Sequence, residues 1–536
     1  MQRRSLGIYP VKSHRNLLSV LGALAVAAML KWTLLSAEAI PFNADEAVVG
    51  LMARHILQGE RPLFFYGQAY MGSLDAWLVA GAFAGIGENV LAIRLIQILL
   101  YLVYLGSLWM MAHRFFEREA IANMAIWIAA IPTVLMTTYT TATLGGYGEL
   151  LVLGNFILWL GYEVIYGKRQ TSHLAWGILG LSSGLAFWTL GLSVVYLLPL
   201  LVVGARHFNR RRLSNYLSAA LGFLIGSSPW WMFNLTHNGA AFGALIGASI
   251  PELPATTLGQ RLVGLLLLGI PTLLGFRFPW SGQLAPWPEV FSMVVIYLGT
   301  ATYLFWGIRR ASLRMASGSQ ALLGGLALSF LLLFLGSRFG VDATGRYFTP
   351  LNLPLVLALA AFADAAWQRR RSLGVGVLLM ILSINLLETA RAATSPDKIT
   401  TQFDPISRFD NRHDAELMTF LRQNRETRGY SNYWVSFRLA FLSQEELIFA
   451  ALLPYKANLS YTPVDSRYPP YEQLVAESPR VAYITTRQPE VDAQIRQRLA
   501  RLGVAFSEAQ VGDYHIFYHL SRIVRPVEIG FGMRFP

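Results

Sequence analysis

The sequence contains no cysteine, and charged residues make up only 14% of its 536 residues. Without cysteine the chain has no disulfide, no zinc–thiolate site and no thiol nucleophile. A hydrophobic content of 54% excludes an ordinary water-soluble enzyme. The sequence also lacks a P-loop, a dinucleotide-binding glycine fingerprint and a His-Glu-x-x-His pair.

The sequence is rich in apolar runs about 20 residues long, the length that spans a bilayer. We place eleven of them near residues 17–37, 89–112, 121–138, 149–166, 174–190, 192–205, 216–233, 290–308, 321–337, 350–367 and 373–390. This pattern predicts a mainly α-helical, polytopic membrane bundle.

Arginine distribution predicts the orientation of the bundle. Alternate loops are basic, at residues 114–118, 168–169, 206–212, 309–314 and 369–371. Because basic loops stay in the cytoplasm, we expect an integral protein of the cytoplasmic membrane with a cytoplasmic N-terminus and an extracytoplasmic C-terminus. The same pattern accounts for the net charge of +13, so no nucleic-acid partner is expected.

The chain divides into two predicted domains. Residues 1–391 form the transmembrane domain, with a first outer loop at 39–88 and a large outer loop at 234–289. From residue 392 to 536 the charge content rises, and helix-like stretches (414–423, 491–502) alternate with strand-like ones (480–486, 513–520). This alternation predicts a small extracytoplasmic α/β domain.

Two adjacent carboxylates, Asp45 and Glu46, follow the first apolar run and open an amphipathic helix at the outer water interface. Asn43 and Glu46 have the spacing of a capping box, which by itself would explain an acid here. One acid suffices for a cap, however, and charged groups beside the hydrocarbon often mark a functional site. Since neighbouring helical residues point about 100° apart, we expect Asp45 to be catalytic and Glu46 mainly to support the helix.

Further polar residues collect at the outer ends of the predicted spans. They are Arg94, Glu149, His237, Arg338, Arg346 and Tyr347. Salt bridges or snorkelling would explain the arginines individually, and an interfacial belt would explain the aromatic residues around His237. As a set on one membrane face with the two acids, the arginines favour an anion site for a lipid phosphate. We assign the arginines and Tyr347 to phosphate binding, Glu149 to the catalytic group and His237 to substrate binding.

These features resemble the polytopic GT-C glycosyltransferases, whose signature includes an Asp-Glu pair in the first outer loop. The resemblance extends to the acid in the second outer loop, the RYFTP motif at 346–350 and the C-terminal domain. Within the superfamily, the bacterial mannosyltransferase-like and aminoarabinose-transferase-like branch is most similar, through FYGQAYMGSL at 65–74 and NYWVSFRLAF at 432–441. In the first of these motifs we assign Tyr66, Gln68 and Tyr70 to substrate binding.

The resemblance implies inverting transfer of a sugar from a polyprenyl-phosphate donor at the outer face, in the cell envelope. The acceptor would be a lipid, a glycan or a protein, and Asp45 would be the base that activates it. The lysine that holds the donor phosphate in aminoarabinose transferases is missing from residues 70–84, so that role falls to arginines such as Arg94 or Arg346. The Asp-x-Asp metal motif of oligosaccharyltransferases is also missing from the first loop, so a divalent metal is possible but not implied, and no other cofactor is expected.

A polytopic lipid or solute transporter or flippase with an outer domain is the alternative. The sequence shows no paired halves with matching broken helices, and its polar residues gather at one membrane face, not near the midplane. A non-catalytic sensor is a third reading, disfavoured by the acids and arginines of the outer face.

Overall fold

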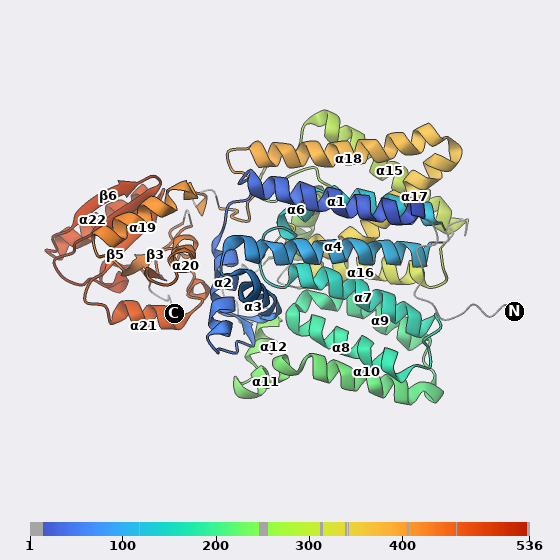
Figure 1. The fold of residues 1–536 in the computed structure, drawn as a ribbon, viewed down its shortest axis with the longest axis horizontal. Coiled ribbons are helices and arrows are strands. Elements are labelled where there is room, and N and C mark those ends of the chain that lie inside the picture. Colours follow the sequence, from blue (N-terminus) through green and yellow to red (C-terminus); the bar gives the residue numbers. More distant parts are fainter. Residues whose placement is uncertain are drawn as a thin grey trace.

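The computed structural model describes residues 14–116, 118–245, 256–310, 315–337, 340, 342, 344–404, 407–456 and 458–532. Long helices form a bundle, and an α/β domain lies at one end of it (Figure 1). The expected fold class is confirmed.

Seven helices in the described ranges are long and apolar enough to cross a membrane. They are α1 (His14–Ser36), α4 (Val90–Phe115), α7 (Tyr147–Ile165), α15 (Trp287–Arg309), α16 (Ser319–Gly336), α17 (Asn352–Arg369) and α18 (Arg371–Thr394). Many of their outward leucines are exposed, as Leu298 and Leu332 are at 62% each. These helices and the fold make the chain an integral membrane protein.

The other four expected spans lie in shorter or interrupted helices. Residues 121–138 form α5 (Glu119–Ala130) and α6 (Val134–Tyr139), and residues 216–233 form α10 (Leu213–Gly226) and α11 (Ser228–Thr236). The breaks coincide with Pro132 and Pro229, because proline removes a helix hydrogen bond and clashes with the preceding turn. The remaining two are α8 (His173–Thr189) and α9 (Val194–Arg206).

The large outer loop is mostly helical where it is described. It contains α12 (Ala240–Leu245), α13 (Leu258–Gly264), a π-helical segment (Leu265–Gly269) and α14 (Ile270–Leu273). Leu266 and Leu267 on this element are exposed.

The first outer loop lies between the bundle and the C-terminal domain (Figure 1). It folds into α2 (Ala44–Leu57), a hairpin of β1 (Phe64–Phe65) and β2 (Gln68–Gly72), and α3 (Leu74–Ile86). Helix α2 is buried along nearly its whole length, packed against α3 and α20. A Cβ at Gly50 would lie 2.5 Å from the Phe441 ring, so glycine is needed for α2 to approach α20 this closely.

The C-terminal domain is built on a five-stranded sheet of order β4-β3-β5-β7-β6. Its strands are β3 (Arg428–Ser431), β4 (Ile448–Ala451), β5 (Ala482–Thr486), β6 (Ser507–Val511) and β7 (Tyr514–Tyr518). Strand β3 pairs in parallel with β4 and β5, and β7 pairs antiparallel with β5 and β6. The helices are α19 (Asp414–Gln423), α20 (Tyr433–Leu442), α21 (Pro469–Ala476) and α22 (Pro489–Arg501).

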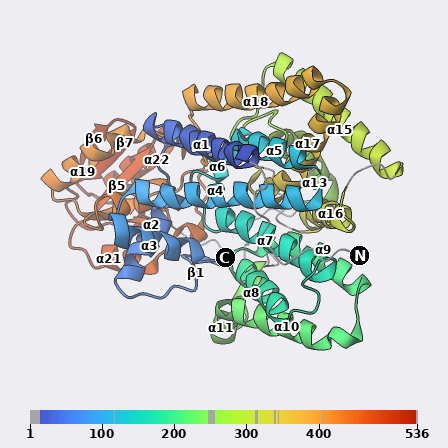
Figure 2. The same ribbon diagram turned by 45° about the vertical axis from the view of Figure 1, so that its right-hand side comes forward.

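Helix α20 is the part of this domain that meets the membrane domain. All of its residues from Tyr433 to Phe441 are buried, and it packs against α2. In the turned view α2 and α3 still lie next to the C-terminal domain, near α21 (Figure 2). The first outer loop and the C-terminal domain therefore share one interface.

Candidate active site

Asp45 lies at this interface, in the first turn of α2. Its Oδ1 accepts a hydrogen bond of 2.5 Å from the hydroxyl of Tyr433, the first residue of α20. Burial raises the pKa of Tyr433 well above its usual value, and the negative charge of Asp45 raises it further. The hydroxyl therefore stays protonated, donates to the carboxylate and fixes its orientation.

Glu46 points away from this pair and is fully buried. Its carboxylate forms the capping box with Asn43 at the start of α2. It also accepts two hydrogen bonds of 2.9 Å each from Arg94, one from Nε and one from Nη2. Arg94 therefore forms a salt bridge, which was the alternative to phosphate binding. This ion pair between Glu46 and Arg94 joins α2 to α4.

Tyr70 on β2 is the residue around which the other charges gather. Burial raises its pKa, Arg346 and Arg467 oppose that shift, and Asp45 and Asp342 add to it. The Tyr70 hydroxyl is therefore within electrostatic reach of two arginines and two carboxylates. Such a mixture of charges suits a ligand that carries both an anionic and a hydroxyl group.

Arg346 opens the short 3-10 helix η5 (Arg346–Leu351) before α17. Its Nη2 lies 2.5 Å from the Asp342 carboxylate, and its guanidinium carbon lies 5.1 Å from the centroid of the Tyr347 ring. Its Nε is buried and has no hydrogen-bond partner among the described residues. Arg346 therefore retains an unused donor, which an anion could accept.

Arg467 was missed in the sequence, and it comes from the C-terminal domain. Its side chain lies over two rings, with the guanidinium carbon 5.2 Å from the centroid of Tyr433 and 6.0 Å from that of Phe65. With its amide oxygen turned towards these donors, Gln68 accepts from both terminal nitrogens of Arg467, at 2.6 and 2.8 Å, and from the Tyr70 hydroxyl at 3.2 Å. The expected substrate residues Gln68 and Tyr70 are thus linked to Arg467, which lies over the ring of the tyrosine that donates to Asp45.

An apolar cavity of about 280 Å³ begins beside these polar groups. Tyr70 and Tyr347 contribute to its wall, and the rest is almost entirely aliphatic or phenylalanine. The lining comprises Tyr70, Leu190, Gly191, Leu192, Val194, Val195, Leu245, Phe330, Leu333, Phe334, Ser337 and Tyr347. A cavity with one polar end suits an apolar chain with an anionic head.

Glu149 lies in a separate buried cluster at the start of α7. Asp75 is next to it, close enough for the two charges to interact, and accepts hydrogen bonds from Gln97 (3.1 Å) and from the Thr143 hydroxyl. Apart from the neighbouring Asp75 carboxyl, the carboxyl oxygens of Glu149 have no hydrogen-bond partner within the described ranges. Its catalytic assignment stays a prediction.

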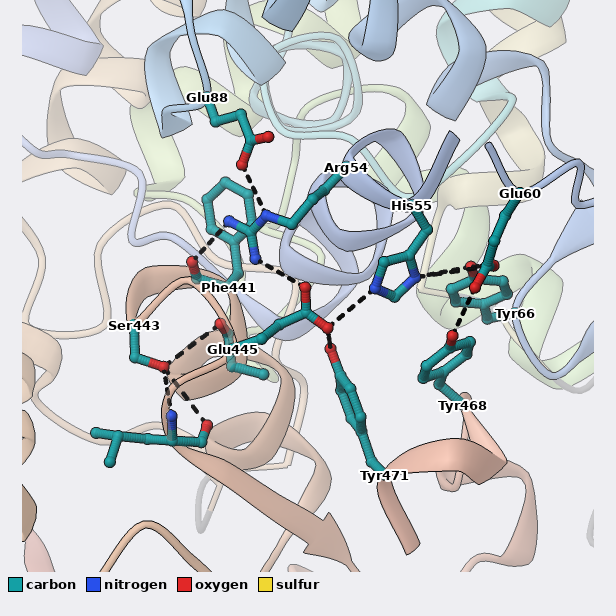
Figure 3. Close-up of polar contacts among 12 residues, drawn as sticks. Arg54, His55, Glu60, Tyr66, Glu88, Phe441, Ser443, Glu445, Tyr468 and Tyr471 are labelled. Carbon is teal, nitrogen blue, oxygen red and sulfur yellow. Dashed lines mark hydrogen bonds and ion pairs between the residues drawn. The ribbon is translucent and has the colours of Figure 1, made fainter. Parts of the chain in front are cut away.

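Tyr66 and His237 make other contacts. The Tyr66 hydroxyl donates to Glu60 at 2.6 Å and lies 2.9 Å from Nδ1 of His55 (Figure 3). His237 is exposed and stacks on Phe233 with ring centroids 4.0 Å apart. Arg338 lies outside the described residues. No group of three or more metal-ligating side chains occurs in the part of the chain that the structure describes.

A search of protein-family models and a search of curated proteins find no match to the sequence. Solved structures do match, over nearly the whole chain. ArnT from Cupriavidus metallidurans in the apo state has 13% identity and a TM-score of 0.61, covering 94% of this chain and 97% of ArnT. ArnT bound to undecaprenyl phosphate has 12% identity and the same TM-score, covering 95% and 99%.

The archaeal oligosaccharyltransferase AglB from Archaeoglobus fulgidus, in complex with an inhibitory peptide and a dolichol-phosphate, is a more distant match. It has 11% identity and a TM-score of 0.54, and the match covers 95% of this chain and 75% of AglB. The mannosyltransferase-like branch expected from the sequence is not distinguished by these matches and stays a prediction. The chain therefore shares the fold of ArnT and AglB, which is the GT-C fold.

Proposed function

We propose that the chain is a membrane glycosyltransferase that moves a sugar from a polyprenyl-phosphate donor to a lipid, glycan or protein acceptor. The observation that carries the proposal is the arrangement around Tyr70. The Tyr70 hydroxyl contacts the Gln68 amide, which holds Arg467 over the ring of Tyr433, the residue that donates to Asp45. Tyr70 also lines the apolar cavity together with Tyr347. The structural match to ArnT bound to undecaprenyl phosphate supports the same class of donor.

Asp45 is the general base in this proposal. The acceptor hydroxyl attacks the anomeric carbon and passes its proton to Asp45, a new carbon–oxygen bond forms on one face, and the bond to the phosphate oxygen breaks on the other. This course inverts the anomeric centre and leaves a polyprenyl phosphate. The hydrogen bond from Tyr433 orients the carboxylate, and one positioned carboxylate is sufficient for the proton transfer.

Arg346 holds the donor phosphate, and the prenyl chain enters the cavity beyond Tyr347. A phosphate leaving group needs little protonation but benefits from a fixed positive charge. Arg346 has a buried Nε that no described residue uses, so a phosphate oxygen can accept from it. In this proposal Arg94 does not hold the phosphate, because Glu46 accepts hydrogen bonds from its Nε and Nη2.

The topology inferred from the arginine loops belongs to this proposal. The N-terminus would be cytoplasmic, and the C-terminal domain, from about residue 392, would lie outside the cytoplasm together with the Asp45 site. The position of α2 at one end of the bundle supports a site near a membrane face (Figure 1). A transporter or flippase would instead need its polar residues near the middle of the bundle.

The test is transfer from radiolabelled polyprenyl-phosphate sugars in membranes that contain the protein, with identification of the product. We expect labelled product with the wild type and strongly reduced product with Asp45→Asn. Asp410→Asn is the matched control, because Asp410 pairs with Arg412 on the surface of the C-terminal domain. If wild-type membranes transfer no sugar from any polyprenyl-phosphate donor, the proposed function is wrong.

A further inference from the structure

We propose that the C-terminal domain completes the donor site, with Arg467 as a second ligand of the donor phosphate beside Arg346. This inference rests on the proposed function. It gives the C-terminal domain a direct part in substrate binding. It also assigns phosphate binding to a residue that lies far from Asp45 in the sequence.

Arg467 is a buried cation with an unused donor. Its exposed fraction is 8%, and its Nε has no hydrogen-bond partner among the described residues. Burial disfavours the charge, but the nearby carboxylates of Asp465 and Asp45 favour it, and the pKa of Arg467 is raised above its ordinary value. The guanidinium therefore stays charged next to the candidate base, and a buried charge of this kind is stabilised by an anionic partner.

The hairpin of the first outer loop fits closely against Arg467. Gly67, in the turn of the hairpin, has φ of +71°, and a Cβ there would lie 3.1 Å from Cδ and 3.3 Å from Cα of Arg467. The positive φ favours glycine at this turn, and a side chain there would press tightly on Arg467. The adjacent Gln68 amide accepts from the two terminal nitrogens and from the Tyr70 hydroxyl, so the side chain is held next to Tyr70.

The residue after Arg467 fixes the same segment to the membrane domain. The Tyr468 ring stacks on Tyr66 with centroids 4.7 Å apart. Its hydroxyl donates to Glu60 at 2.7 Å, and the Tyr66 hydroxyl donates to the other oxygen of Glu60 (Figure 3). Tyr66, expected to bind substrate, thus helps to position Arg467.

A second contact fixes the segment three residues further on. Glu445 accepts a hydrogen bond of 2.7 Å from Tyr471, and its Oε1 also lies 3.0 Å from Nε2 of His55 (Figure 3). Arg54, which donates to Glu88 at 2.7 Å, lies 3.4 Å from the other oxygen of Glu445. Glu445 thus joins α2 to the C-terminal domain, and Tyr468 and Tyr471 attach the segment directly after Arg467 to the same interface, so the position of Arg467 is set by two domains.

Arg467 has an alternative role as a counter-ion for Asp45 alone. The two roles differ in how the protein distinguishes a phosphate head from a neutral one. A phosphate ligand contributes to the affinity for undecaprenyl phosphate and not to that for undecaprenol, which carries the same chain. A pure counter-ion leaves the ratio of these two affinities unchanged.

The experiment measures binding of both lipids to the full-length protein in detergent. We expect Arg467→Ala to weaken undecaprenyl phosphate binding by about 10- to 100-fold, as for loss of hydrogen bonds to a charged group, with undecaprenol binding unchanged. Arg467→Lys should lose part of this affinity, because lysine keeps the charge without the planar fork. Arg412→Ala is the control, since Arg412 is a 73% exposed arginine of the same domain and should bind both lipids like the wild type.

The outcomes separate the two proposals. If the wild type does not prefer undecaprenyl phosphate to undecaprenol, the proposed function fails. If the wild type has this preference and folded Arg467→Ala keeps it within about twofold, the role of Arg467 is refuted while the function stands. Should Arg467→Ala not fold, Arg467→Lys decides: a reduced preference supports the inference, and an unchanged preference overturns it.

Discussion

Replacing Asp45 by asparagine tests the chemistry with little disturbance of the fold. Asparagine has the same shape, and its oxygen can still accept the hydrogen bond that Tyr433 donates to Oδ1. The capping box and the ion pair with Arg94 belong to Glu46, so α2 keeps the contacts that stabilise it. The substitution therefore removes the proton acceptor and leaves the surrounding contacts.

We expect turnover to fall by about 10²–10⁴-fold, the usual contribution of a positioned general base. Donor affinity should change little, because the proposed phosphate ligands are Arg346 and Arg467. The thermal unfolding midpoint should stay close to that of the wild type, since the carboxylate of Asp45 is only half-buried.

The assay is single-turnover transfer with the purified variant and a saturating polyprenyl-phosphate sugar, alongside its thermal unfolding curve. Asp410→Asn, purified in the same way, controls for the loss of an acid in general. Near-normal turnover by folded Asp45→Asn would refute the assignment of Asp45 as the base.

Three further predictions concern the residues around this site. Glu46→Gln leaves the buried Arg94 without its charge partner and should destabilise the protein by about 3–5 kcal/mol, which thermal unfolding measures; an unchanged midpoint would mean that the ion pair is dispensable. Hydrogen bonds from His55 and Tyr471 outweigh burial and lower the pKa of Glu445 to about 2 from its ordinary 4.5, so its stabilisation should be complete above about pH 4.5 and lost as the pH falls towards 2. Unfolding midpoints measured against pH should therefore depend less on pH in Glu445→Gln than in the wild type; equal slopes would contradict this. Arg346→Ala should raise the KM for the donor more than Arg346→Lys does, and steady-state kinetics showing equal KM values in both variants and the wild type would remove Arg346 from the phosphate site.

Sequence patterns with a local physical cause predicted their structural counterparts well. The apolar runs became the long helices of the bundle, and the Asn43–Glu46 spacing became the capping box of α2. The acids and arginines were recognised as unusual because charges beside hydrocarbon are costly. Local sequence patterns therefore predicted the helical bundle and the cap of α2, and they marked the charged residues as unusual.

The partners of these polar groups could not be predicted, because they are set by distant packing. Nothing near Arg94 in the sequence shows that Glu46, 48 residues earlier, occupies its fork. Tyr433 meets Asp45 across 388 residues, and Arg467 reaches the same place only because the C-terminal domain packs on α2. The sequence does contain a signal for Arg467, because it lies in a stretch rich in proline and tyrosine between residues 461 and 471. That stretch does not show which part of the protein the Arg467 side chain contacts.

Helix lengths were also overestimated where proline interrupts an apolar run. Hydropathy averages over Pro132 and Pro229, whereas the backbone ends one helix and begins another there. Composition alone reports apolar content, and it does not report whether the hydrogen-bond pattern continues.

The measurement that tests the central claim most directly is the stoichiometry of transfer by the purified wild-type protein. Incubated with a radiolabelled polyprenyl-phosphate sugar and an acceptor extract from the membrane, the protein should form polyprenyl phosphate and glycosylated product in equal amounts, with the anomeric configuration inverted. Movement of intact donor across a reconstituted bilayer, without formation of either product, would contradict a glycosyltransferase and favour a transporter.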